Sequence, residues 1–219
     1  MEKPLKHFGI IGDVHAEDIA LATTLDALRA MRVDAILCVG DIVDGVGSVD
    51  ECCSLLQQHH VIAVRGNHER WFLGGTMREL SDANPVGSLS KATMAYLSSL
   101  PPTITLKTIL GDLMLCHGLG RKDMACLTPD DYGYALEVNG DLHELLATGV
   151  KLVVGGHTHK RMVRRFDSTT IINAGTLKRN YHPCFGLINL VTRKVQFFNL
   201  DESTRWSEAE SIELERERS

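Results

Sequence analysis

Over the first hundred residues, short apolar runs alternate with segments whose apolar residues recur at helical spacing. The strand-like runs span residues 7–12, 34–40 and 61–64, and the helical segments span 17–31, 48–58 and 88–100. The last helical segment ends before two consecutive prolines, Pro101 and Pro102, which cannot continue a helix. Strands that alternate with helices in this way predict a parallel sheet covered by helices.

The second half of the chain is mostly strand-like. Seven further runs predict strands, at residues 103–107, 113–117, 151–156, 161–166, 169–175, 185–190 and 194–200. One helix near residues 134–147 interrupts them. We therefore predict an α/β (α+β) fold, a sheet-rich sandwich with helices outside, formed as one domain by residues 1–200. For the charged C-terminal tail, residues 201–219, two alternatives stay open: a docked helix held by Trp206, or a frayed end.

Composition and charge argue against several classes of function. No apolar run approaches the roughly 18 residues needed to cross a bilayer, so we expect no membrane partner. The N-terminus lacks the apolar segment and cleavage site of a signal peptide, which favours a cytoplasmic protein. The formal charge of −5 argues against general nucleic-acid binding through phosphates. The six cysteines lack zinc-finger spacing, and buried thiols are favoured over a disulfide framework.

Five of the strand-like runs are followed directly by residues that bind metals in other proteins. These residues are Asp13 and His15 in GDVH, Asp41 and Asp44 in GDIVD, Asn67 and His68 in GNHE, His117 in CHG, and His157 and His159 in GHTH. One such residue alone is usually a cap or turn residue that satisfies backbone groups. In open α/β sheets, however, ligands bind outside the carboxyl ends of strands. Five recurrences, most of them beside a glycine, therefore predict one shared metal site.

These five blocks, in this order, resemble the calcineurin-like metallophosphoesterase superfamily, in particular its small bacterial and archaeal phosphodiesterase (class III phosphatase-like) branch. The resemblance spans residues 12–159 and implies a four-layer β-sandwich of mixed sheets flanked by helices. It also implies two divalent metal ions. Carried over by motif, Asp13, His15 and His159 hold one ion, Asn67, His117 and His157 hold the other, and Asp41 bridges both. Imidazole, carboxylate and amide ligands suit several metals, and we expect manganese, with iron, zinc, nickel or cobalt as alternatives.

The resemblance assigns catalytic roles to two further residues. His68 is expected to lie over the phosphate and to protonate the leaving oxygen, and Asp44 to hold His68 in orientation. A turn residue before Gly45 is the alternative for Asp44. We leave Glu69 outside the site, as a carboxylate that meets a helix dipole. For Arg65 an ion pair that shapes the turn is favoured over a contact with substrate.

The expected reaction is hydrolysis of phosphomonoesters or phosphodiesters by in-line attack of a metal-bridging hydroxide. Its substrate is a phosphate-ester small molecule or a nucleotide. A dinucleoside polyphosphate hydrolase or a phosphoprotein phosphatase is an alternative, disfavoured because Gly45 stands where those families have arginine. A non-catalytic scaffold with this fold is the alternative of another class, disfavoured because every ligand type and His68 are present. The oligomeric state and the role of loop 118–134 stay open.

Overall fold

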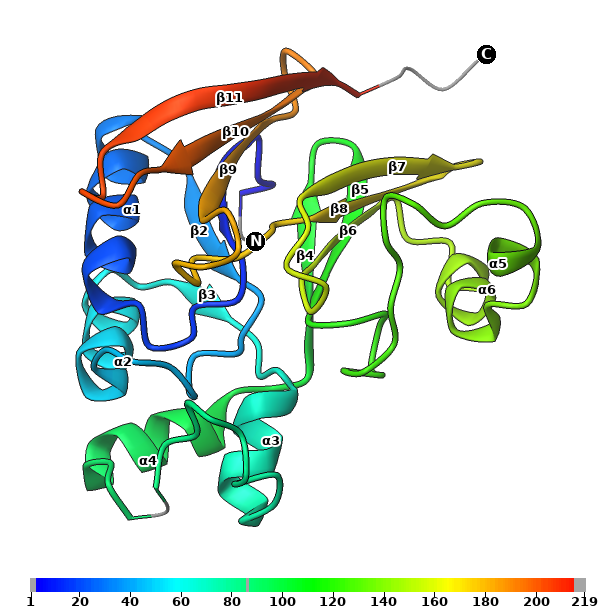
Figure 1. Ribbon diagram of the computed structural model, residues 1–219. Helices are drawn as coiled ribbons and strands as arrows, with labels where there is room; N and C mark the ends of the chain where they lie inside the picture. The colour runs from blue at the N-terminus through cyan, green and yellow to red at the C-terminus, as the bar shows by residue number, and fades with distance from the viewer. Residues whose placement is uncertain (1–2, 86, 215–219) are drawn as a thin grey trace.

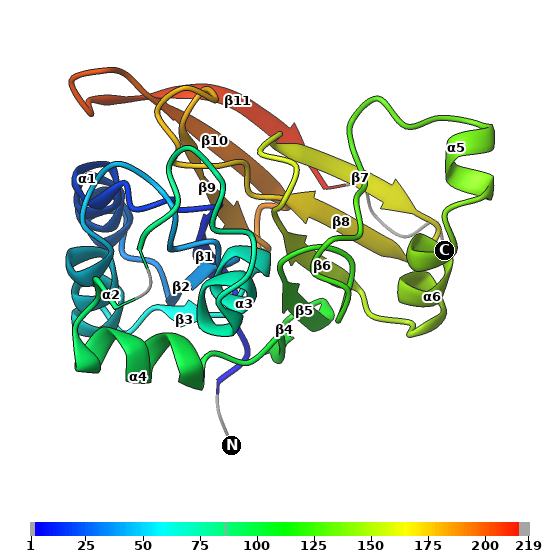
Figure 2. The ribbon, with the colours of Figure 1, turned by 60° about the horizontal axis from the view of Figure 1, so that its bottom comes forward.

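Two mixed β-sheets lie face to face in the computed structural model, which describes residues 3–85 and 87–214 (Figure 1). The first sheet has the strand order β11-β10-β9-β1-β2-β3, and the second has the order β4-β5-β6-β8-β7. Helices cover the outer face of each sheet, as Figures 1 and 2 show. The architecture is the α/β sandwich of mixed sheets that the sequence predicts.

The first sheet contains the parallel core expected from the alternating pattern. Strands β1 (His7–Ile11), β2 (Ala35–Cys38) and β3 (Ile62–Ala63) pair in parallel, and α1 (Asp18–Ala30) and α2 (Val49–Gln58) connect them. Three antiparallel strands extend this sheet: β9 (Cys184–Asn189), β10 (Lys194–Leu200) and β11 (Trp206–Glu213). The carboxyl ends of β1, β2 and β3 therefore lie at the same edge.

The second sheet is formed by the later strand-like runs. Its strands are β4 (Thr103–Thr108), β5 (Gly111–Cys116), β6 (Leu152–Gly155), β7 (Met162–Phe166) and β8 (Thr169–Asn173). Strands β5, β6 and β8 are parallel, and β4 and β7 pair antiparallel at the two edges. All four residues of the central strand β6 are buried, as a strand covered on both faces requires.

Three apolar clusters fill the spaces between the four layers. One packs α1, α2 and α4 (Lys91–Ser99) on the outer face of the first sheet and includes Leu25 and Leu56. The second lies between the sheets and joins Phe8 to Leu115. The third packs α6 (Gly140–Ala147) on the outer face of the second sheet. Five of the six cysteines are buried free thiols, which confirms the predicted thiol state for those five.

The helix predicted near residues 134–147 is two helices. A short helix α5 (Tyr134–Glu137) ends before Val138, and α6 begins at Gly140. The break lies at Asn139, whose side chain accepts a hydrogen bond from the backbone N–H of Leu142 at 2.9 Å. Asparagine is a preferred N-cap because its short side chain satisfies a free N–H of the first turn. No helix within residues 3–85 and 87–214 has the length and apolar character to cross a membrane.

Both expectations for the C-terminal tail are wrong over residues 206–213, which form β11 at the edge of the first sheet. Trp206 packs its ring against Phe185 and Phe198, at centroid distances of 6.2 Å and 5.5 Å. Leu214, 6% exposed, lies in the cluster between the two sheets. The strand lacks an apolar period because its residues are exposed, except for the half-buried Ile212. The tail prediction for residues 215–219 lies outside the described residues.

Truncation of Leu214 tests whether β11 contributes to stability. We expect Leu214→Ala to lower the free energy of unfolding by about 2 kcal/mol or more, because it leaves a cavity between the sheets. Ser211→Ala, an exposed change in β11 itself, should stay within about 0.5 kcal/mol of wild type. Urea unfolding followed by circular dichroism measures both. Equal midpoints for the two variants would show that the strand end is not part of the core.

Candidate metal centre

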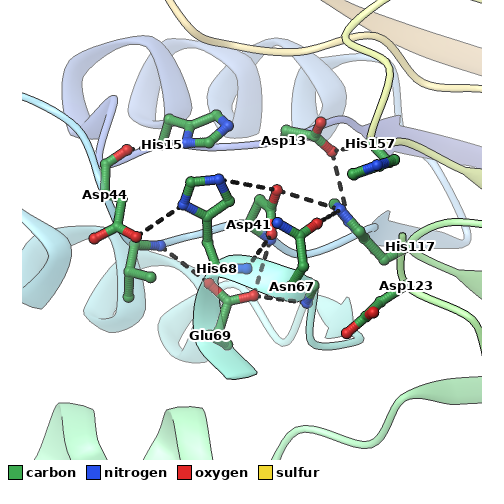
Figure 3. Close-up of polar contacts among 12 residues, drawn as sticks. Asp13, His15, Asp41, Asp44, Asn67, His68, Glu69, His117, Asp123 and His157 are labelled. Carbon is green, nitrogen blue, oxygen red and sulfur yellow. Dashed lines mark hydrogen bonds and ion pairs between the residues drawn. The ribbon is translucent and has the colours of Figure 1, made fainter. Parts of the chain in front are cut away.

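The predicted strand-end residues of both sheets converge on one place (Figure 3). Those of the first sheet follow β1, β2 and β3, and those of the second follow β5 and β6. Three overlapping groups of side chains bring their ligand atoms within 4.8 Å of one another. The groups are Asp13, His15 and His159; Asp41, His117 and His157; and His15, Asp41 and His68. Asp41 belongs to two groups and so lies between the other ligands.

The group of Asp13, His15 and His159 has the geometry of a cation site. His15 Nδ1 donates to the backbone carbonyl of Asp44 at 2.9 Å, so its Nε2 carries the lone pair. This Nε2 lies 3.0 Å from His159 Nε2, which lies 3.1 Å from Asp13 Oδ2. Asp13 Oδ2 is buried and has no hydrogen-bond partner. A buried carboxylate oxygen without a donor, beside two imidazole nitrogens, fits a divalent metal ion.

The second group places acceptor atoms around one imidazole nitrogen. His117 Nδ1 donates to the carbonyl of Val39 at 2.9 Å, which turns Nε2 toward the site. That Nε2 lies 2.9 Å from Asn67 Oδ1 and 3.2 Å from Asp41 Oδ2. Three atoms with lone pairs face one another, an arrangement that only a proton or a cation stabilises. The donor set therefore fits a second divalent ion, with Asp41 positioned to contact both.

Burial and charge act in opposite directions on the pKa values of these groups. Burial would raise the pKa of Asp41, but the imidazoles of His117, His68 and His15 hold that pKa below its usual range. Burial lowers the pKa of both His15 and His157, which favours the neutral, ligating imidazole. Burial also opposes protonation of His117, yet the carboxylates of Asp41 and Asp13 raise its pKa to about 10. A bound cation would take the place of that proton.

His68 and Asp44 form a pair beside the metal ligands. His68 Nδ1 donates to Asp44 Oδ2 at 2.8 Å, and the backbone N–H of His68 donates to Asp41 Oδ1 at 2.9 Å. His68 Nε2 faces the site, 3.9 Å from Asp41 Oδ2. Burial opposes protonation of His68, but its bond to Asp44 and the nearby Asp41 raise its pKa. Burial likewise opposes ionisation of Asp44, whose pKa the bonds from His68 and Arg78 lower to about 2.

Five of the nine predicted site residues have a left-handed backbone. The φ angles are 46° at His15, 46° at Asp41, 67° at Asp44, 69° at His157 and 59° at His159. Residues with a side chain seldom adopt this region, and such strained positions cluster at functional sites. Ala16, where the resembled family often has glycine, also has a positive φ of 56°.

Glu69 belongs to the site, although the sequence reading left it out. Its buried carboxylate accepts four backbone N–H groups, from Asp41 at 2.9 Å, Ile42 at 2.6 Å, Val43 at 3.0 Å and Gly66 at 2.7 Å. Burial and the charge of Asp41 raise its pKa to about 7, against the N–H groups of Gly66 and Val43. The local signal was present, because Glu69 stands at the third position of α3 (Asn67–Gly74), three residues after Gly66 at the N-cap, as in a capping box.

Arg78 and Asn84 are the other site residues that the sequence did not indicate. Both lie between α3 and α4, and both bind Asp44: Arg78 Nη1 and Nη2 donate to its carboxylate at 2.8 Å and 2.9 Å, and the backbone N–H of Asn84 donates at 2.9 Å. No local pattern could have found them, because the contacts join residues at least 34 positions apart. Asp44 is therefore more than a turn residue.

The ion pair expected for Arg65 is absent: its guanidinium has no partner among residues 3–85 and 87–214, and its backbone N–H donates to the carbonyl of Pro101.

In loop 118–134, Lys122 pairs with Asp141 and Glu144 on α6. These two ion pairs tie the loop to α6.

Gly45 explains why no arginine stands in the GDIVDG block. A Cβ atom at this position would lie 1.8 Å from the backbone oxygen of His15. No side chain fits there while the loop keeps this conformation. The loop that presents Asp44 therefore excludes an arginine at this position, which the phosphoprotein phosphatases were expected to have.

Comparison with known proteins places the chain in a family. The calcineurin-like phosphoesterase superfamily domain matches residues 7–193, so the chain belongs to this superfamily. An uncharacterized protein of Methanocaldococcus jannaschii is 28% identical over 177 residues, which cover 77% of this chain and 68% of the relative.

Solved structures share the fold. The metallophosphoesterase from Sphaerobacter thermophilus has a TM-score of 0.65 and 26% identity, covering 90% of this chain and 89% of that chain. Vacuolar protein sorting 29 from Cryptosporidium parvum has a TM-score of 0.56 and 18% identity, covering 97% and 100% of the two chains. At that lower identity the likeness concerns the fold alone.

Replacement of Glu69 by glutamine tests its role beneath the site. The amide keeps one acceptor oxygen and turns an NH₂ group toward backbone donors, so Glu69→Gln should cost on the order of 3 kcal/mol of stability. The exposed Glu79→Gln serves as the matched control. Thermal unfolding and metal analysis provide the measurements. If Glu69→Gln matched its control in both, the buried hydrogen bonds would not support the site.

Proposed function

We propose that the chain is a dinuclear, metal-dependent phosphoesterase that hydrolyses phosphomonoesters or phosphodiesters of small molecules or nucleotides. The observation that supports this most strongly is the pair of ligand groups that share Asp41, with His68 directly beside them. Asp13, His15 and His159 would hold one ion, and Asn67, His117 and His157 the other. Manganese is the proposed metal, with iron, zinc, nickel or cobalt as alternatives.

Two divalent ions bound there would supply Lewis acidity toward phosphate oxygens and would lower the pKa of an attacking water. With two such ions bound, the pocket would carry a net positive charge, because only Asp13 and Asp41 among the proposed ligands are anionic. An acidic chain can in this way attract an anionic substrate. The buried imidazoles of His15 and His117 are each held by a hydrogen bond from Nδ1 to a backbone carbonyl. Their Nε2 atoms therefore face the site without a change of ring orientation.

His68 acts on the leaving group in this proposal. Because Nδ1 donates to Asp44, the exchangeable proton that faces the site is the one on Nε2. His68 gives this proton to the departing oxygen as its bond to phosphorus breaks, and regains one from water afterwards. The bond to Asp44 raises the pKa of His68 and so favours its protonated form. Turnover that depends on this proton should therefore fall as the pH rises through the pKa of His68.

A scaffold is the competing function, since vacuolar protein sorting 29 shares the fold. Metal binding alone does not separate the two functions, but turnover does. The deciding experiment is a panel of p-nitrophenyl phosphate, bis-p-nitrophenyl phosphate, cyclic nucleotides and dinucleoside polyphosphates, assayed with Mn²⁺. A protein that binds two ions and hydrolyses none of these would be assigned to the scaffold class.

Metal analysis of single variants tests the division of ligands. Protein purified without chelator should contain close to two transition-metal equivalents, because two ligand groups are present. His157→Ala and His159→Ala should each lose chiefly one equivalent, and from different positions. His143→Ala, an exposed histidine on α6, should retain both. Loss of the same ion in both site variants would contradict the assignment.

Removal of the His68 imidazole tests its role as proton donor. We expect His68→Ala to slow turnover about 10²–10⁴-fold, the usual contribution of general acid catalysis, with metal content near wild type. The fall in rate at high pH should disappear with it. Steady-state kinetics and elemental analysis on the same preparation provide the measurement. If metal is lost instead, His68 is a ligand.

A further inference from the structure

The carboxylate of Asp44 is fully buried and accepts four hydrogen bonds, more than orientation of one histidine needs. Oδ1 accepts from Arg78 Nη1 at 2.8 Å and from the backbone N–H of Asn84 at 2.9 Å. Oδ2 accepts from His68 Nδ1 at 2.8 Å and from Arg78 Nη2 at 2.9 Å. A bidentate guanidinium fixes the plane of a carboxylate as well as its position. Asp44 therefore cannot turn about its terminal bond without losing at least two bonds.

The residues that hold Asp44 are themselves held. Arg78 Nε donates to the carbonyl of Thr76 at 2.8 Å, and the guanidinium lies 5.5 Å from the centre of the Phe72 ring. Asn84 Oδ1 accepts the backbone N–H of Asp44 at 2.7 Å. Both the backbone and the side chain of Asp44 are thus bound by one short segment, residues 78–84. We call this segment the Asp44 clamp.

The far side of the clamp is tied to the other rim of the site. Asp82, within the clamp, pairs with Lys178 at 2.6 Å. Lys178 lies two residues after Thr176, whose hydroxyl donates to the backbone carbonyl of the metal-ligand candidate Asp13. Figure 2 shows the chain after α3 running from that helix toward the loop that precedes β9. The clamp is therefore braced at Asp44 and at Lys178.

We infer that Arg78, supported by Asn84, is a positioning residue that fixes the Asp44 carboxylate and through it aims His68 Nε2 at the leaving oxygen. This inference rests on the proposed function. Among the described residues, no hydrogen bond or ion pair joins Arg78 to a proposed metal ligand, and its effect passes through Asp44. Asp44 also supports His15 through its backbone carbonyl. The side chain of Asp44 thus orients His68, and its backbone carbonyl orients the proposed ligand His15.

Loss of the clamp should slow hydrolysis most for substrates whose leaving oxygen needs a proton in order to depart. A nitrophenolate departs without a proton, whereas an alkoxide needs one in the transition state. A small misplacement of a catalytic group can cost about 10²-fold in rate. Arg78→Ala should therefore slow hydrolysis of an alkyl ester by about 10- to 100-fold through kcat, and slow the nitrophenyl ester by about threefold or less.

The test compares Arg78→Ala with Arg70→Ala on p-nitrophenyl and alkyl esters of whichever class, monoester or diester, wild type hydrolyses. Arg70 makes a similar bidentate pair, with Asp123 at 2.6 Å and 2.9 Å, but does not touch Asp44. It should leave the ratio of the two rates unchanged. Guanidinium ion should partly restore the alkyl-ester rate of Arg78→Ala. Arg78→Lys should fall between, because an ammonium cannot bridge both carboxylate oxygens.

Two further measurements, the rate of a double variant and the NMR signal of His68, test the inference. The double variant Arg78→Ala/His68→Ala should be no slower on the alkyl ester than His68→Ala alone, because both changes remove one function. In the Zn²⁺-loaded protein, proton NMR should show an exchange-protected Nδ1–H of His68 that Arg78→Ala loses and Arg70→Ala keeps. Equal slowing of both esters, additive variants, or a protected proton in Arg78→Ala would overturn the inference. If the proton behaves as expected and wild type hydrolyses no ester, the clamp stands and the proposed function fails.

Discussion

The carboxylate of Glu69 is the interaction on which the rest of the site depends. Three of its hydrogen bonds come from consecutive residues after β2, and the fourth comes from Gly66 after β3. One side chain therefore ties together the exits of two neighbouring strands. A buried carboxylate is stable only when donors satisfy it, and here the four N–H groups would otherwise be unpaired. The carboxylate and the N–H groups thus satisfy one another in the buried interior. The chain after β2 turns around this carboxylate, and Asp41 has a left-handed backbone there.

Glycines let the ligand-bearing turns approach one another closely. A Cβ at Gly66 would lie 2.1 Å from Asp41 Oδ1, and one at Gly156 would lie 2.3 Å from Asp13 Oδ1. The space that a side chain would fill is occupied by the ligand of a neighbouring strand. At Gly66 and Gly156 the glycine is therefore a consequence of how the turns pack against one another. It is not only a means of making each turn tight.

The sequence predicted the features that depend on local pattern, and missed those that depend on distant partners. Strand ends such as Asp41 and His157 were found because an apolar run followed by a polar residue is visible in a few positions. The strand β11 was missed because its stability comes from pairing with β10, with little burial of its own. Arg78 was missed because only the folded chain brings it to Asp44. Glu69 could have been found, since the capping-box spacing is local.

The proposed ligands come from both sheets, and this links metal binding to the fold itself. Asp13, Asp41 and Asn67 follow strands of the first sheet, whereas His117, His157 and His159 follow strands of the second. An ion held by both sets joins the two halves of the sandwich, and its binding free energy adds to folding stability. A chain with this fold could therefore retain the ligands for stability after losing catalysis. The His68–Asp44–Arg78 chain has no such structural link between the sheets, since all three residues lie on the side of the first sheet. Its presence therefore supports catalysis in a way that the metal ligands alone do not.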